Sequence, residues 1–179
     1  MTRIRRVPCG ARLRSLPFSE PSSRARASTR RGTLRKVVYY LFNSVPGNAA
    51  DGSALRRLVA ECLDVKMWGI GEDEPHSHAL APGDLTLIYL SAPERLLIGQ
   101  ATLASAVHPW TSSEARMYPG DSPHGVLLAS VERWDRTVPM ETVLRRIDQS
   151  EGARADFQAG VVRITPNEYE TALAVAAGL

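Results

Sequence analysis

Several common sequence signatures are absent from this chain, and each absence excludes a class of protein. No uncharged apolar run reaches about 18 residues, so the sequence contains no candidate for a membrane-spanning helix. Cys9 and Cys62, the two cysteines, are 53 positions apart, which argues against a zinc ribbon, a thioredoxin motif and a disulfide scaffold. Neither GxxxxGK(S/T) nor GxGxxG occurs, so the common phosphate-binding loops are excluded. No serine lies in a GxSxG elbow, so the sequence does not indicate an enzyme with a serine nucleophile.

Positive charge is concentrated at the start of the chain. Residues 1–32 contain nine arginines and one acidic residue, whereas the remaining residues include 13 basic and 18 acidic ones. The segment 1–32 is rich in Arg, Ser and Pro without apolar periodicity, so we expect a disordered leader before a folded domain at 33–179. Three interpretations of the leader stay open: it binds phosphate groups, it is an organelle transit peptide, or it is an extension or mis-assigned start without function.

The pattern from residue 33 onward predicts an α+β domain around a partly closed sheet. Residues 37–42 are β-branched and aromatic, which predicts a buried first strand. A helix is expected after it, with Asp51 as the N-cap and apolar residues at helical spacing up to Cys62. Residues 108–123 are expected to form a long loop. Further strands are expected at 65–70, 85–90, 96–107, 126–134 and 161–164, and further helices begin at Pro139 and Pro166.

One short segment combines residue types that bind metal ions. Glu72, Asp73, His76 and His78 supply carboxylate and imidazole groups within seven positions. The segment is polar, contains Pro75 and lies between two turns, so we favour a solvated loop over a metal site.

The three tryptophans differ in their sequence surroundings. Trp134 ends a strand of alternating type and is explained by packing. Trp68 lies between a short strand and the acidic loop, outside any apolar run long enough to bury it. Trp110 lies in the predicted long loop, where a bulky aromatic either fixes the loop to the core or lines a site.

These pieces, taken in order, resemble the EVE domains, which belong to the PUA-like superfamily and are related to the YTH readers of methylated adenine in RNA. The resemblance covers about residues 35–178. Two departures from the family are Asn43, where many relatives have a lysine, and the Gly-Ile-Gly that follows Trp68. The matching motifs are the opening strand with its polar exit (39–46), the strand that carries Trp68 (67–70), the Pro-Gly-Asp turn before a strand (80–89), a glycine-bearing strand (98–101), a Pro-led helix start (138–141) and the closing strand with its helix entry (162–169).

The resemblance implies both a fold and a function. The implied fold is a PUA-like mixed β-barrel or curved sheet of about six strands with peripheral helices. The implied function is that of a module, not an enzyme, that binds a modified and methylated base flipped into an aromatic pocket, with no cofactor and no metal. Its partners would be modified DNA or RNA or a modified nucleoside, with a protein that acts on the signal, in the cytoplasm and away from membranes.

Specific residues follow from this hypothesis. Trp68 is the expected stacking wall and Trp110 a second one, while Asn43 and Ser44 contact the edge of the base. Further base-binding candidates are Gly69, Tyr40 and Tyr118, and the candidates for phosphate contacts are Arg56, Arg57, Arg116 and Arg154. Two alternatives stay open: a metal-dependent enzyme or sensor that uses the loop 72–78, and a protein-interaction domain with a vestigial pocket.

Overall fold

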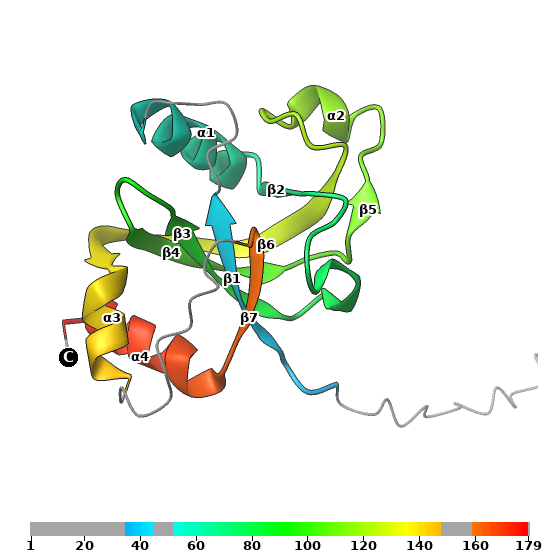
Figure 1. The fold of residues 1–179 in the computed structure, drawn as a ribbon. Coiled ribbons are helices and arrows are strands. Elements are labelled where there is room, and N and C mark those ends of the chain that lie inside the picture. Colours follow the sequence, from blue (N-terminus) through cyan, green and yellow to red (C-terminus); the bar gives the residue numbers. More distant parts are fainter. Residues whose placement is uncertain (1–34, 45–51, 148–158, 179) are drawn as a thin grey trace, which may run out of the picture. The chain divides into compact units, whose positions relative to one another are not determined.

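A computed structural model describes residues 35–44, 52–147 and 159–178 (Figure 1). The predicted leader, the expected N-cap Asp51 and Arg154 lie outside the described residues. Within the described ranges, no helix has the length and apolar character needed to cross a membrane. The elements are β1 Tyr39–Ser44, α1 Gly52–Asp64, β2 Met67–Ile70, the 3₁₀ helix η1 Ser77–Ala79, β3 Leu85–Leu90, β4 Leu96–Leu103, β5 His108–Pro109, α2 Glu114–Met117, β6 His124–Pro139, α3 Met140–Arg146, β7 Val161–Ile164 and α4 Pro166–Ala176.

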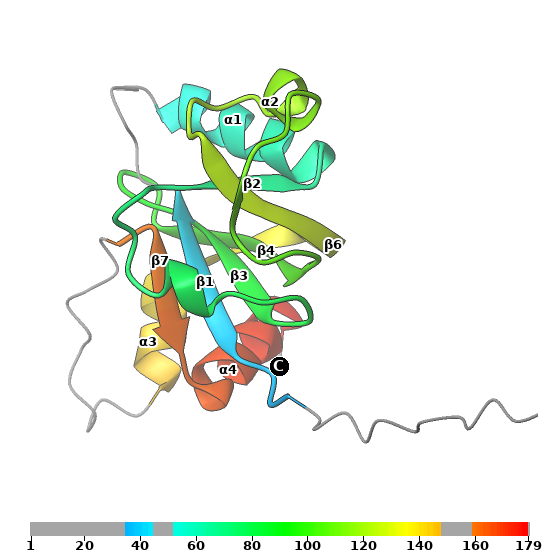
Figure 2. The same cartoon turned by 90° about the vertical axis from the view of Figure 1, so that its right-hand side faces the viewer.

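The strands form one mixed sheet that curls into a half-barrel (Figure 2). Six strands follow each other in the order β2-β6-β4-β3-β1-β7, and the short β5 pairs with β6. β1 runs parallel to β3, whereas the other pairs are antiparallel. The register of β4 against β6 shifts twice, which is the kind of irregularity that bends a sheet. The predicted α+β, PUA-like sheet of about six strands is confirmed.

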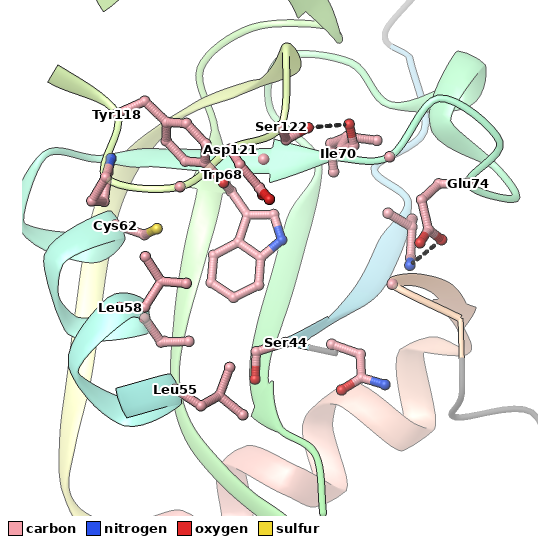
Figure 3. Close-up of a pocket in the computed structure, with 18 residues that line it drawn as sticks. Ser44, Leu55, Leu58, Cys62, Trp68, Ile70, Glu74, Tyr118, Asp121 and Ser122 are labelled. Carbon is pink, nitrogen blue, oxygen red and sulfur yellow. Dashed lines mark hydrogen bonds between the residues drawn. The ribbon is translucent and has the colours of Figure 1, made fainter. Parts of the chain in front are cut away.

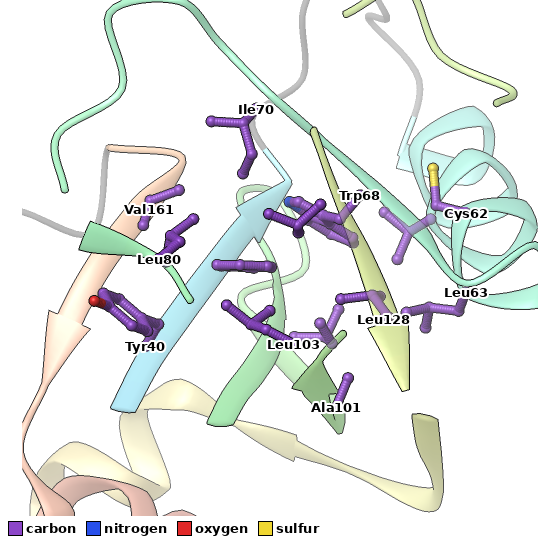
Figure 4. Packing of buried hydrophobic residues seen from close by; sticks show 14 of the residues in the cluster. Tyr40, Cys62, Leu63, Trp68, Ile70, Leu80, Ala101, Leu103, Leu128 and Val161 are labelled. Carbon is purple, nitrogen blue, oxygen red and sulfur yellow. The ribbon is translucent and has the colours of Figure 1, made fainter. Parts of the chain in front are cut away.

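Alternating side chains divide the core between the two faces of the sheet. On β1, Tyr40 and Phe42 enter one hydrophobic cluster, and Leu41 enters the other. Helix α1 covers the first cluster with Leu55, Val59, Cys62 and other apolar side chains (Figure 4). Helices α3 and α4 cover the second cluster, on the opposite side of the sheet (Figure 1).

The predicted element boundaries are correct at several sites and wrong at others. Helix α4 begins as predicted, with a capping box in which Glu168 N donates to Thr165 Oγ1 at 3.2 Å and Thr165 N donates to Glu168 Oε2 at 2.6 Å. The prediction of a structureless loop at 108–123 is wrong, because β5 and α2 lie within it. Both elements are shorter than five residues and have too few positions to produce a periodic pattern.

The Pro-Gly-Asp turn at 82–84 lies immediately before β3, and its aspartate side chain also binds the backbone just before β1, the strand parallel to β3. Gly83 has a φ of 87°, a conformation that side chains with a Cβ rarely adopt. The Asp84 side chain is fully buried and accepts hydrogen bonds from Val38 N at 3.0 Å and Ala81 N at 3.1 Å. Arg35 also donates to both of its oxygens, at 2.7 and 3.0 Å. One carboxylate therefore fixes the entry of β1 against that of β3.

We expect Asp84→Ala to lower the free energy of unfolding by about 2–4 kcal/mol, because it removes the acceptor of two backbone N–H groups and of Arg35. Urea denaturation would measure the loss. Asp73→Ala is the matched control: that side chain is exposed, so the change should be within about 0.5 kcal/mol. A loss below about 1 kcal/mol for Asp84→Ala would contradict this role of the turn.

Candidate functional site

A cavity of about 630 Å³ opens between helix α1 and the curled sheet (Figure 3). Its walls come from α1, from the C-terminal end of β1, from β2 and the glycine that follows it, from residues 118–122 and from the start of β7. These segments are distant in the sequence, and the sheet order brings them to one end of the half-barrel. The cavity brings together five of the predicted base-binding residues, namely Trp68, Asn43, Ser44, Gly69 and Tyr118.

Trp68 lines the cavity and is also part of the hydrophobic core. Its side chain is 6% exposed, and its ring stacks on Phe42 with a centroid distance of 5.8 Å and an angle of 27° between the planes. The expectation that Trp68 stands outside the core is wrong, because α1 packs over β2 and supplies the apolar neighbours that a local sequence window lacks. Phe42 holds the indole in place, which makes it a rigid wall for the cavity.

Asn43 and Ser44 end strand β1 at the cavity and are 4% and 8% exposed. Asn43 N donates to Gly160 O at 2.8 Å, which ties this end of β1 to the segment before β7. Ser44 Oγ donates its proton to Tyr89 O at 3.0 Å. Since a hydroxyl has a single proton to donate, Ser44 would act toward a ligand as an acceptor.

Tyr118 covers Gly69 and closes one side of the cavity. A Cβ atom on Gly69 would lie 2.0 Å from the Tyr118 hydroxyl, so a glycine is needed for this contact. Burial raises the pKa of the Tyr118 hydroxyl well above its usual value, so this group, neutral at physiological pH in any case, stays neutral in alkaline solution as well.

Trp110 supports the wall from behind and is not among the residues that line the cavity. Its Nε1 donates to Ser122 O at 2.8 Å, and its ring lies 5.1 Å from that of Tyr118. Its ring also lies directly over Gly125, where a Cβ would come within 2.1 Å of it. Of the two interpretations left open by the sequence, the one in which Trp110 fixes the loop agrees with these contacts. Tyr40, the other aromatic candidate, is 1% exposed and packs in the core away from the cavity lining.

The charged groups at the cavity are carboxylates. Glu74 and Asp121 line it, and no Lys, Arg or His is among the lining residues that the structure describes. Of the predicted phosphate contacts, Arg56 lies on α1 and pairs with Glu94, with Nε–oxygen distances of 3.1 and 3.2 Å. Arg57 on α1 and Arg116 on α2 are exposed. A phosphate group would therefore be attracted by arginines outside the cavity and repelled by the carboxylates that line it.

The acidic loop does not assemble a metal site. Among the described residues, no three His, Cys, Asp or Glu side chains are grouped so that they could hold a metal ion. Glu74 instead accepts a hydrogen bond from Val161 N at 3.1 Å. Three histidines, His78, His108 and His124, line a second cavity of about 420 Å³, and His108 Nε2 lies 3.4 Å from a Glu114 oxygen.

Sequence reasoning missed the α1 wall, residues 119–122 and Glu74. The apolar spacing of α1 predicts that one face of the helix is buried. The same spacing fits a helix packed along its whole length and a helix that lines a cavity, so it does not predict the cavity. Residues 119–122 and Glu74 lie in irregular segments, and only the fold brings them to the cavity.

Cys62 lines the cavity as a buried thiol, and burial raises its pKa to about 11. Since the thiolate is the reactive form, the alkylation rate of native Cys62 should rise about tenfold per pH unit from pH 7 to 10. Iodoacetamide labelling followed by mass spectrometry would measure it in a Cys9→Ser background. Denatured protein is the control, in which the rate should level off above about pH 8.5. A native rate that also levels off near that pH would contradict the raised pKa.

Comparison with known proteins defines the fold class. No protein-family model and no curated protein matches the chain. Similar solved structures include human THYN1 in complex with 5-methylcytosine containing DNA (TM-score 0.55, 14% identity, 78% of this chain and 97% of that chain). A hypothetical protein from Leishmania major has a TM-score of 0.54 at 16% identity, over 80% of this chain and 96% of its own. A protein from Pseudomonas putida has a TM-score of 0.51 at 18% identity, over 78% of this chain and 99% of its own.

These likenesses establish a PUA-like fold for the chain. They confirm, at the level of the fold, the resemblance to EVE domains that the ordered sequence motifs indicate.

Proposed function

We propose that this protein is a binding module, not an enzyme, for a methylated base that is flipped out of DNA or RNA. The observation that carries the proposal is the cavity itself, in which a rigid tryptophan faces a space bordered by the polar end of β1. Its volume of about 630 Å³ falls in the range of about 300–1,000 Å³ typical of small-molecule sites. The likeness in fold to human THYN1, solved with 5-methylcytosine containing DNA, agrees with such a ligand.

The lining suits a methylated base. Flipping a base costs a few kcal/mol, and stacking on an aromatic side chain returns about 1–3 kcal/mol. Leu55, Leu58 and Val59 form an apolar wall on α1, where an added methyl group would be buried out of water. The hydrogen-bonding edge of the base would meet Asn43, Ser44 and backbone groups near Gly69, so its polar atoms need not be buried without partners.

The groups at the cavity are better suited to binding than to catalysis. The Cys62 thiol has a pKa of about 11 and is almost entirely protonated at neutral pH. The Ser44 hydroxyl donates to a backbone carbonyl, whereas a nucleophile needs a base to take that proton. For the alternative of a metal-dependent enzyme or sensor, the acidic loop lacks the required grouping among the residues described. A protein-interaction domain remains an outcome of the test below.

We expect Trp68→Phe to weaken binding of a methylated oligonucleotide at least about fivefold, because a smaller ring offers less stacking area to the base. Fluorescence polarisation would measure binding to labelled single strands that carry 5-methylcytosine or N6-methyladenine, against unmodified strands. Phenylalanine is used instead of alanine because Trp68 is buried. The Trp68→Ala substitution would lower the free energy of unfolding by about 3–5 kcal/mol.

Trp134→Phe is the matched control, since Trp134 packs in the cluster on the other face of the sheet. It should leave binding within about twofold of the wild type. Equal weakening by the two substitutions, or no preference for any methylated strand, would overturn the proposed function and favour a vestigial pocket.

A further inference from the structure

Glu74 is held at the cavity by backbone contacts. Its Oε2 accepts a hydrogen bond from Val161 N at 3.1 Å (Figure 3). Its carboxyl group also lies over Gly160, where a Cβ atom would come within 2.4 Å of Oε1. The close approach of the carboxylate thus depends on a residue without a side chain. The acidic loop, which the sequence indicated as solvated, places one fixed carboxylate at the site.

The same contacts fix Glu74 relative to the other polar groups of the cavity. Gly160 O accepts a hydrogen bond from Asn43 N at 2.8 Å, so the carboxylate and the end of β1 are held by one short stretch of backbone. Asp121, the second carboxylate at the cavity, is exposed, whereas Glu74 is half-buried. An anchored and partly desolvated carboxylate discriminates more strongly between ligand donors and acceptors than an exposed one.

A carboxylate accepts hydrogen bonds and cannot donate them. Its partner on a base must therefore be an N–H group, such as the amino group at C4 of cytosine or C6 of adenine. Thymine, uracil and hypoxanthine carry a carbonyl oxygen at the equivalent position, and two acceptors repel each other. The ring N–H of these bases lies one position away from that carbonyl, so the base would have to shift in the cavity to donate to Glu74. No cationic side chain is among the described lining residues to offset the repulsion.

We propose that the cavity selects a base with an amino group at C4 of a pyrimidine or C6 of a purine, and that Glu74 accepts the hydrogen bond from that group. This inference rests on the proposed function and names its ligand class. Such a contact would also allow the cavity to distinguish 5-methylcytosine from thymine, which a protein that recognises methylated DNA must do. Thymine carries the same 5-methyl group as 5-methylcytosine, so a cavity that reads the methyl alone cannot tell them apart.

The test compares two single-stranded DNA oligonucleotides that differ at one base, 5-methylcytosine or thymine. Single strands avoid a difference in the pairing partner. Fluorescence polarisation should show the 5-methylcytosine strand binding the full chain about 10- to 100-fold more tightly. Equal binding of both strands, each weakened by Trp68→Phe, would overturn this inference and leave the proposed function standing. No Trp68-dependent binding of either strand, nor of the N6-methyladenine strand, would overturn both.

The variant Glu74→Gln identifies the group responsible. Glutamine keeps a carbonyl that can accept from Val161 N but loses the charge, and its amide can also donate to a carbonyl oxygen. The preference for 5-methylcytosine should fall to within about threefold, while thermal denaturation checks that the variant folds. Glu72→Gln makes the same change on an exposed residue of the same loop that does not line the cavity, and is the matched control, which should keep the preference. A preference that survives Glu74→Gln, or that Glu72→Gln abolishes instead, would overturn the assignment of Glu74.

Discussion

The buried carboxylate of Asp84 is the constraint on which the arrangement of the site depends. It binds the backbone before β1 and the turn before β3, so that the two strands begin at a fixed register and run parallel. Parallel neighbours place their C-terminal ends at the same edge of a sheet. The polar residues Asn43 and Ser44 end β1 at that edge, where the curled sheet leaves the cavity.

The stack of Trp68 on Phe42 couples the core to the cavity. Phe42 comes from β1 and Trp68 from β2, two strands that are not neighbours in the sheet and that the curl brings into contact. A wall held in this way loses little side-chain freedom when a ligand stacks on it, which lowers the entropic cost of binding. The same burial means that the indole contributes to folding, in addition to the stacking role that the proposed function gives it.

Local sequence patterns were sufficient for most of the longer elements and for part of the cavity lining. The run at 37–42, the helical spacing before Cys62 and the Thr165 capping box each depend on neighbouring residues, so a single sequence reveals them. Trp68, Asn43 and Ser44 were predicted as base contacts from the order of motifs, and the fold brings all three to the cavity. Glu74 and the segment 119–122 also line the cavity, but they lie in irregular segments, and no periodic sequence pattern predicts where such segments run. Trp110 was noticed as an aromatic residue in a predicted loop, but its packing role depends on Gly125 of the neighbouring strand β6, which the local sequence does not reveal.

The distribution of charge determines which interactions could hold a ligand in the cavity. The residues after position 32 carry more acidic than basic groups, and the cavity itself is lined by two carboxylates, so general attraction to phosphates is weak there. Under the proposed function, a base would therefore be held mainly by stacking, by burial of apolar groups and by hydrogen bonds to its edge. Of these, stacking is shared by every base and methyl burial is worth only about 1–3 kcal/mol. A fixed acceptor such as Glu74 distinguishes bases of similar shape, because a mismatched base would leave buried polar atoms unpaired or opposed.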